Sequence, residues 1–226
     1  MCLFIGEASK DVLEECLVPG YSFIAGRKLS SDKIRLNCFV QDTVQYDVEA
    51  WECEIPVVSI KIMGWCLIEV YREWQIPGTT GSMKINLQES RFRSLVDKLA
   101  EKNDKTCCLG DFNFDVLNVD SDYQRKFDKM REKMTDDLLL NGWCQLVTEP
   151  TRSLKGRNLA TLDQIYTNSL DYVEGHLNSN IISTDHNMIG AVLSTKNPAF
   201  QRQVISYHIG SQSQESHEEG SDEDKK

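Results

Sequence analysis

The sequence lacks the features of a membrane-spanning or disulfide-bonded secreted protein. Its start has no basic segment followed by an apolar signal region, and no apolar run approaches the roughly 18 residues of a membrane span. Eight cysteines are scattered without a Cys-x-x-Cys pair or zinc-type histidine spacing, which argues against a disulfide framework or a zinc site. We therefore expect reduced thiols, no membrane partner, and a location in the nucleus or cytoplasm.

The sequence also has fewer basic residues than is usual for a protein that binds a polyanion mainly through charge. Its 25 Lys and Arg stand against 35 Asp and Glu, a formal net charge of −10, which argues against tight, purely electrostatic binding to nucleic acid. Residues 211–226 hold six acidic residues and two lysines, and their composition predicts a disordered acidic tail. The 226-residue length suits one layered domain, which we place at 1–196, with 197–226 as a C-terminal extension.

Strand-like and helix-like segments alternate along 1–196. The segments that read as strands are 3–5, 34–40, 56–62, 65–71, 106–109, 162–167 and 188–194, with a hairpin turn at Met63-Gly64. One predicted helix carries the apolar stripe Phe92, Leu95, Val96 and Leu99, and a second has Tyr123, Phe127, Met130, Met134 and Leu138 on one face and a cap at Asn141-Gly142. This interleaving favours a mixed-sheet α/β layering over a doubly wound parallel sheet.

Two short polar segments are the candidates for chemistry. In the first, a buried strand stops at Gly110 and presents Asp111 and Asn113 on one side, where Asp can accept a proton from water and Asn can donate to a phosphate oxygen. In the second, Thr184-Asp185-His186-Asn187, an imidazole at the entrance of a strand can stabilise charge on a phosphoryl group. The alternative interpretations are an ordinary turn at the first segment and a surface loop at the second.

Together with other motifs in the same order, these segments resemble the endonuclease/exonuclease/phosphatase superfamily, specifically the apurinic-type endonuclease domain of non-long-terminal-repeat retrotransposons. The resemblance runs from about Leu3 to Leu193. The motifs are Glu7, Pro19-Gly20-Tyr21, Tyr71-Arg72-Glu73-Trp74, Gly110 to Asn113, Glu149-Pro150-Thr151-Arg152, Thr161 to Asn168 and Ser183 to Ile189. The resemblance implies an α/β (α+β) fold, a four-layered sandwich of two mixed β-sheets flanked by helices.

The resemblance also implies a metal and a water-activating group. A divalent cation, Mg²⁺ or Mn²⁺, would be held by Glu7 with help from Asp185, and would polarise the scissile phosphate. Asp111 would activate or position the attacking water, and Asn113 would orient Asp111 and bind a phosphate oxygen. The alternative for Glu7 is a solvated strand end.

Three further roles follow from the same resemblance. His186, paired to Asp163, would stabilise the transition state, and Tyr71 would donate to the phosphate or to the leaving oxygen. Asp163 is flanked by apolar residues, and a carboxylate so placed needs a partner, whereas Tyr71 could be a packed strand aromatic. The substrate would be DNA, nicked to leave a 3′-hydroxyl primer.

The sequence departs from the family pattern at several points. Met1 falls inside what would be the second strand, so we expect the first strand to be missing. Gln164 stands where His is common, Thr184 where Ser is common, and Lys28 to Asp32 replace a glycine-rich segment. Three hypotheses follow: a metal-dependent DNA endonuclease of retrotransposon origin, a catalytically inactive relic or binding module of the same fold, and a phosphatase acting on inositol phosphates or phospholipids.

Overall fold

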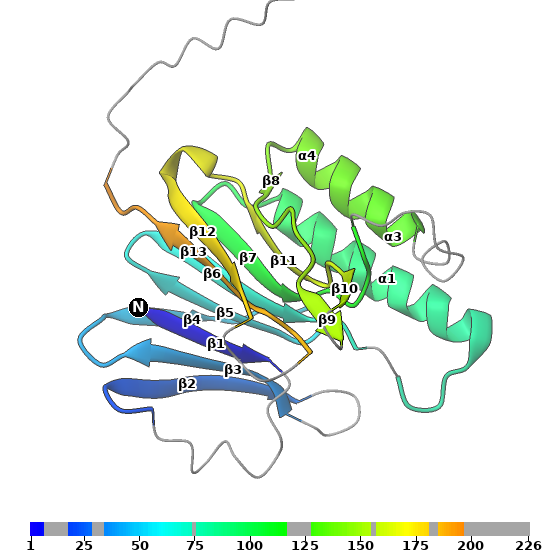
Figure 1. Ribbon diagram of the computed structural model, residues 1–226, viewed down its shortest axis with the longest axis horizontal. Coiled ribbons are helices and arrows are strands. Elements are labelled where there is room, and N and C mark those ends of the chain that lie inside the picture. The colour runs from blue at the N-terminus through cyan, green and yellow to red at the C-terminus, as the bar shows by residue number, and fades with distance from the viewer. Residues whose placement is uncertain are drawn as a thin grey trace, which may run out of the picture.

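A six-stranded mixed sheet forms the centre of the fold (Figure 1). The computed structural model describes residues 1–6, 18–28, 34–73, 76–116, 128–154, 157–180 and 185–196. The strand order in the sheet is β4 (Tyr46–Glu49), β5 (Val57–Ile62), β6 (Trp65–Tyr71), β7 (Thr106–Asp111), β11 (Asp163–Thr167) and β8 (Cys144–Gln145). β6 and β7 run parallel and the other neighbouring pairs antiparallel, which confirms the predicted mixed sheet.

The hairpin between β5 and β6 forms where the sequence predicts it. Met63 and Gly64 both have positive φ, 50° and 79°, as a two-residue hairpin turn of type I′ requires. The side chains of β6 alternate as expected. Cys66, Ile68 and Val70 face the helices, whereas Trp65 and Leu67 face the opposite layer.

β7 is longer than predicted, because it continues through Gly110 to Asp111 instead of stopping at the glycine. Gly110 lies opposite Val70 of β6 and Gln164 of β11. Gly and Asp are poor strand formers in isolation. Here β6 and β11, one on each side, supply backbone hydrogen-bond partners, and this pairing extends β7 as far as Asp111.

Helices cover one face of the central sheet (Figure 1). Helix α1 (Gly81–Ala100) buries the predicted stripe of Phe92, Leu95, Val96 and Leu99 against that face. The second predicted helix spans 123–138. Its described part consists of α3 (Asp128–Glu132), a π-helical turn η1 (Lys133–Asp137) and α4 (Leu138–Leu140). Tyr123 and Phe127 of the predicted helix lie outside the described residues. Met130, Met134 and Leu138 are buried, and Gly142 (φ 77°) adopts the left-handed conformation predicted for the cap.

A second layer of strands covers part of the opposite face. It contains the antiparallel sheet β1 (Cys2–Gly6), β3 (Ile34–Gln41) and β2 (Tyr21–Lys28), and the antiparallel pair β12 (Val173–Ser179) and β13 (Met188–Leu193). The short 3₁₀ turn η2 (Leu170–Tyr172) precedes β12. The predicted α/β sandwich of two packed strand layers is therefore present, with its described helices on the outer face of the central sheet.

The described cysteines form no disulfide. Seven of them, Cys2, Cys38, Cys53, Cys66, Cys107, Cys108 and Cys144, carry free thiols. Most lie inside the fold, and burial raises the pKa of the Cys107 thiol to about 12. Over the described ranges, no helix combines the length and apolar character needed to cross a membrane.

Candidate active site

Three neighbouring strands bring Tyr71, Asp111 and Asp163 to one edge of the central sheet. Asp111 ends β7, lies opposite Tyr71 of β6, and lies opposite Asp163 of β11 on its other side. Residues directly opposite one another in a sheet share a face, so the three side chains are neighbours. Asp111 and Tyr71 are only 8% and 6% exposed, which places the Asp111 carboxylate at a shallow, partly desolvated position.

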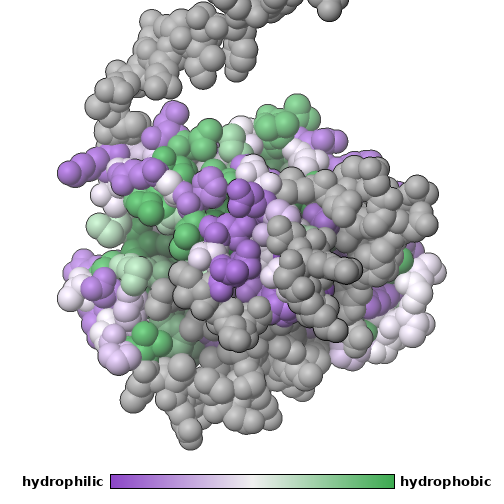
Figure 2. All heavy atoms as spheres, in the orientation of Figure 1, coloured by the Kyte–Doolittle hydropathy of each residue, from purple (hydrophilic) through white to green (hydrophobic). Residues whose placement is uncertain are grey.

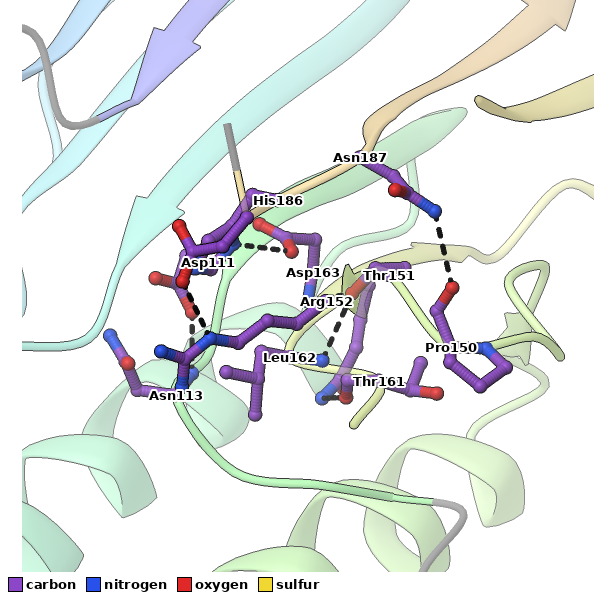
Figure 3. Close-up of polar contacts among 12 residues, drawn as sticks. Asp111, Asn113, Pro150, Thr151, Arg152, Thr161, Leu162, Asp163, His186 and Asn187 are labelled. Atoms are coloured by element: carbon purple, nitrogen blue, oxygen red, sulfur yellow. Dashed lines mark hydrogen bonds and ion pairs between the residues drawn. The ribbon is translucent and has the colours of Figure 1, made fainter. Parts of the chain in front are cut away.

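His186 joins this group from the chain segment that leads into β13. Its Nδ1 lies 2.9 Å from Oδ2 of Asp163 (Figure 3). One oxygen or nitrogen from each of Asp111, Asp163 and His186 lies within 4.8 Å of the other two. Two carboxylates and an imidazole from sites 52 and 23 residues apart along the chain are thus gathered in one cluster, which we call the carboxylate–histidine cluster.

The negative charges of the cluster favour the protonated form of His186. The hydrogen bond to Asp163, together with the negative charges of Asp163, Asp111 and Asp185, outweighs burial and raises the pKa of His186 to about 9. Both ring nitrogens of an imidazolium carry protons. With Nδ1 bonded to Asp163, Nε2 supplies a proton that can be donated to an anionic oxygen.

Asn113 and Arg72 fix the turn that follows Asp111. Asn113 has a left-handed φ of 53°, which Asn tolerates better than most residues, and its backbone N–H donates to Oδ1 of Asp111 at 2.8 Å. Its side-chain amide donates to the backbone oxygen of Arg72, also at 2.8 Å. The buried Arg72 guanidinium donates in turn to the backbone oxygens of Phe112 and Asn113. Asn113 thus orients Asp111 through its backbone N–H, whereas its side-chain amide is hydrogen-bonded to the backbone of Arg72.

Asp185 lies beside the cluster and is held by an arginine. Its Oδ2 accepts a hydrogen bond from Nε of Arg152 at 2.9 Å. Partial burial opposes ionisation, but the Arg152 guanidinium and the charge of His186 lower the pKa of Asp185. Asp185 is not part of the carboxylate–histidine cluster in the described residues. Its metal-binding role stays a prediction, as does that of Glu7, which together with Thr184 lies outside the described residues.

Thr151 is a supporting residue to which the sequence assigned no role. It is fully buried, and its Oγ1 accepts hydrogen bonds from the backbone N–H groups of Leu162 and Asp163 at 3.1 and 2.9 Å (Figure 3). The backbone oxygen of Thr151 accepts from the N–H of Asn187. One residue therefore connects the start of β11, which carries Asp163, to the segment that carries His186.

We predict that Thr151→Val destabilises the fold by about 1–3 kcal/mol, because valine keeps the shape but leaves two buried N–H groups without an acceptor. Urea unfolding measures this free energy. Thr195→Val, at an exposed position, is the matched control and should change it by less than about 0.5 kcal/mol. Equal effects of the two variants would contradict the supporting role of Thr151.

A second prediction concerns pH. A histidine whose pKa rises from 6.5 to about 9 on folding adds stability that is fully present below pH 6.5 and is lost as the pH rises through 9. In metal-free buffer, the free energy of unfolding should fall by about 1–3 kcal/mol across this window. Asp163→Asn should remove most of that fall. Urea unfolding of both proteins at pH 6.5 and 9.5 with EDTA checks it, and identical pH dependence would refute the assigned pairing.

The similarity of this chain to known proteins lies in its fold. No protein-family model and no curated protein sequence matches the chain. Solved structures do match: the endonuclease domain of TRAS1, a telomere-specific non-LTR retrotransposon, has a TM-score of 0.53 and 17% identity over 79% of this chain and 81% of that one. The Xenopus laevis APE2 catalytic domain has a TM-score of 0.58 and 11% identity over 85% and 82%. The chain has the endonuclease/exonuclease/phosphatase fold.

A third structure is similar over a comparable length. The 3′ phosphatase NExo from Neisseria, bound to product DNA hairpin, has a TM-score of 0.54 and 15% identity over 85% of this chain and 88% of that one. Identities this low show the endonuclease/exonuclease/phosphatase fold alone. The chemistry of this chain therefore has to be argued from its own residues.

Proposed function

We propose that this chain is a metal-dependent phosphodiester hydrolase that cuts DNA. The observation that carries the proposal is the carboxylate–histidine cluster of Asp111, Asp163 and His186 at the edge of the central sheet. The similar structures support it, because they are named as a retrotransposon endonuclease, a 3′ phosphatase bound to a DNA product and the APE2 catalytic domain. The similarity to TRAS1 and the motif order favour a retrotransposon origin and an endonuclease activity.

The residues of the cluster fit a hard divalent cation. Carboxylate oxygens are the ligands that Mg²⁺ and Mn²⁺ prefer, and Mg²⁺ is commonly held by one or two carboxylates together with substrate phosphate. Asp111 and Asp163 would hold the ion, with Glu7 and Asp185 as further proposed ligands. With its Nδ1 hydrogen-bonded to Asp163, His186 would be left to contact the substrate through Nε2. When bound, the cation supplies charge neutralisation at the phosphate.

The protein groups divide the remaining work. Asp111 accepts a proton from the attacking water, held in place by the backbone N–H of Asn113. The His186 imidazolium, oriented by Asp163, donates to a phosphate oxygen as negative charge develops in the transition state. Tyr71, opposite Asp111 in the sheet, donates to the phosphate or to the leaving oxygen. Asn113 binds a phosphate oxygen if its amide leaves the Arg72 carbonyl.

Nicking of supercoiled plasmid tests the proposal. With Mg²⁺, the protein should convert supercoiled to open-circular DNA, and EDTA should stop the conversion. Asp111→Asn keeps the size of the side chain but removes the proton acceptor, and it should lower the rate by a factor of about 10² or more. Nicking by the variant at the wild-type rate would trace the activity to a contaminant and reject the proposal.

Two alternative functions predict different results with the same purified protein. A phosphatase acting on inositol phosphates or phospholipids would release inorganic phosphate from inositol polyphosphates and leave plasmid intact. A catalytically inactive binding module, which the net charge of −10 favours, would do neither. Calorimetric titration with Mg²⁺ adds a further test, since tight binding that is lost in Asp111→Asn counts against the inactive module.

A further inference from the structure

Two thiols meet across the paired strands β1 and β3. In the register of this antiparallel pair, Cys2 lies opposite Val40 and Cys38 lies opposite Phe4, so the cysteines are diagonal neighbours on one face. Their Sγ atoms are 3.7 Å apart. A disulfide has an S–S bond of about 2.0 Å, so the two sulfurs need to approach by less than about 2 Å to be joined. The contact therefore needs only a small movement to become a covalent bond.

The two thiols differ in exposure. Cys38 lies on the central strand of the three-stranded sheet and is 0% exposed. Cys2 is half-buried, on a strand that pairs only with β3 in the described part of the chain. Figure 2 shows a hollow with apolar surface between β1 and β13, on the side of β1 away from β3. A small uncharged oxidant such as hydrogen peroxide can therefore reach Cys2 first, and β1 is held loosely enough to make the movement.

The contact favours the thiolate at Cys2. The hydrogen bond with Cys38 lowers the pKa of the Cys2 thiol; partial burial opposes this, and the positive charge of the N-terminus assists it. The same contact and burial raise the pKa of Cys38, which therefore keeps its proton. Burial also raises the pKa of the nearby Glu69 carboxyl well above the usual value, against a backbone hydrogen bond with Asn37, so Glu69 adds little negative charge beside the thiolate.

We propose that Cys2 and Cys38 form a redox-sensitive dithiol site that a hydroperoxide oxidises to a reversible disulfide between β1 and β3. The Cys2 thiolate attacks one oxygen of hydrogen peroxide, the O–O bond breaks, and the departing hydroxide takes up the proton that the Cys2 thiol released. Cys2 is then a sulfenic acid. The Cys38 sulfur attacks the Cys2 sulfur, and the hydroxyl of the sulfenic acid leaves with the Cys38 proton as a second water. Two thiols are oxidised and one peroxide is reduced.

Two other buried thiols provide an internal comparison. Cys107 and Cys108 are adjacent in the sequence, but they face opposite sides of β7 and belong to different core clusters. Burial raises the pKa of Cys107 to about 12 and raises that of Cys108 well above the usual value. Both thiols therefore stay protonated, and they should react with peroxide at least about tenfold more slowly than Cys2.

Peptide mapping of the full-length protein tests this inference, which does not rest on the proposed function. The reduced protein is treated with a small excess of hydrogen peroxide, and the remaining thiols are blocked with N-ethylmaleimide in denaturant. We expect a Cys2–Cys38 linked peptide pair, lighter by about 2 Da than the two thiol peptides, with Cys107 and Cys108 blocked. Dithiothreitol should restore both thiols, as a reversible disulfide requires.

Three variants separate the two steps. Cys38→Ser should stop the reaction at the sulfenic acid, which dimedone then labels at Cys2, whereas wild type should give little label because Cys38 consumes the intermediate. Cys2→Ser should leave Cys38 as a thiol. Cys144→Ser, which removes another half-buried thiol, is the control and should leave the Cys2–Cys38 bond unchanged.

Two outcomes would overturn the inference. Recovery of both Cys2 and Cys38 as blocked thiols after peroxide treatment of the folded wild type would show that the pair does not close, and this result needs no variant. Oxidation that links Cys2 to a different cysteine, or to a second copy of the chain, would show that Cys38 is not its partner. Neither result depends on whether the protein cuts DNA, so failure here is distinguishable from failure of the nicking assay.

Discussion

Asp163→Asn is expected to slow Mg²⁺-dependent DNA nicking by a factor of about 10²–10⁴. The amide cannot hold the imidazolium that Asp163 holds through its 2.9 Å contact, so His186 loses both its orientation and its raised pKa. His186→Gln should cause a loss of similar size, because it removes the proton donor itself. Rates are measured as the initial appearance of open-circular plasmid.

A double variant that carries both Asp163→Asn and His186→Gln tests whether the two side chains act together. If Asp163 and His186 act as a unit, the double variant should be no slower than the slower single variant, within about threefold. Asp104→Asn, which changes a carboxylate 64% exposed in a surface ion pair with Lys61, is the control and should retain the wild-type rate. Losses that multiply in the double variant would show that the two side chains act independently.

Gly110→Ala is expected to destabilise the fold by at least about 3 kcal/mol. Gly110 has a φ of +144°, and an added Cβ would lie 1.9 Å from the backbone oxygen of Val70 in the neighbouring parallel strand. No side-chain rearrangement can relieve a clash between two main chains, so β6 and β7 would have to separate. Denaturant unfolding measures the loss, and failure to give soluble protein would be its extreme form.

Gly190→Ala provides the comparison for this clash. Gly190 also lies in a strand, but an added Cβ there would meet nothing within 4 Å. We expect its effect to stay within about 1 kcal/mol. Equal stability of the two variants would contradict the close approach of β6 and β7 at Gly110, and with it the placement of Asp111 beside Tyr71.

Local sequence signals predicted the elements that carry their own pattern. The apolar stripe of α1 and the turn at Met63-Gly64 appear in the structure as expected, because helix period and turn chemistry are encoded within a few residues. The continuation of β7 through Gly110 was missed for the opposite reason. It depends on ladders to β6 and β11, whose residues lie far away in the sequence.

In the candidate site, too, the sequence predicted some residues and missed the role of others. Motif resemblance singled out Asp111, Asp163 and His186, and the structure places them together, although their catalytic roles stay proposals. Thr151 and Arg72 lay inside quoted motifs without a role, because a threonine or arginine acquires a structural function only from the backbone groups that the fold brings to it. The contact between Thr151 and the N–H of Asp163, 12 residues away, is a property of tertiary structure.

The most direct test of the central claim is single-turnover cleavage of an end-labelled DNA duplex by wild type and Asp111→Asn, with and without Mg²⁺. The proposed hydrolysis predicts cleavage that requires Mg²⁺, leaves a 3′-hydroxyl that a polymerase can extend, and falls by a factor of about 10² or more in the variant. Cleavage at equal rates in the two proteins, or an intact duplex with a folded, Mg²⁺-supplied wild type, would contradict it.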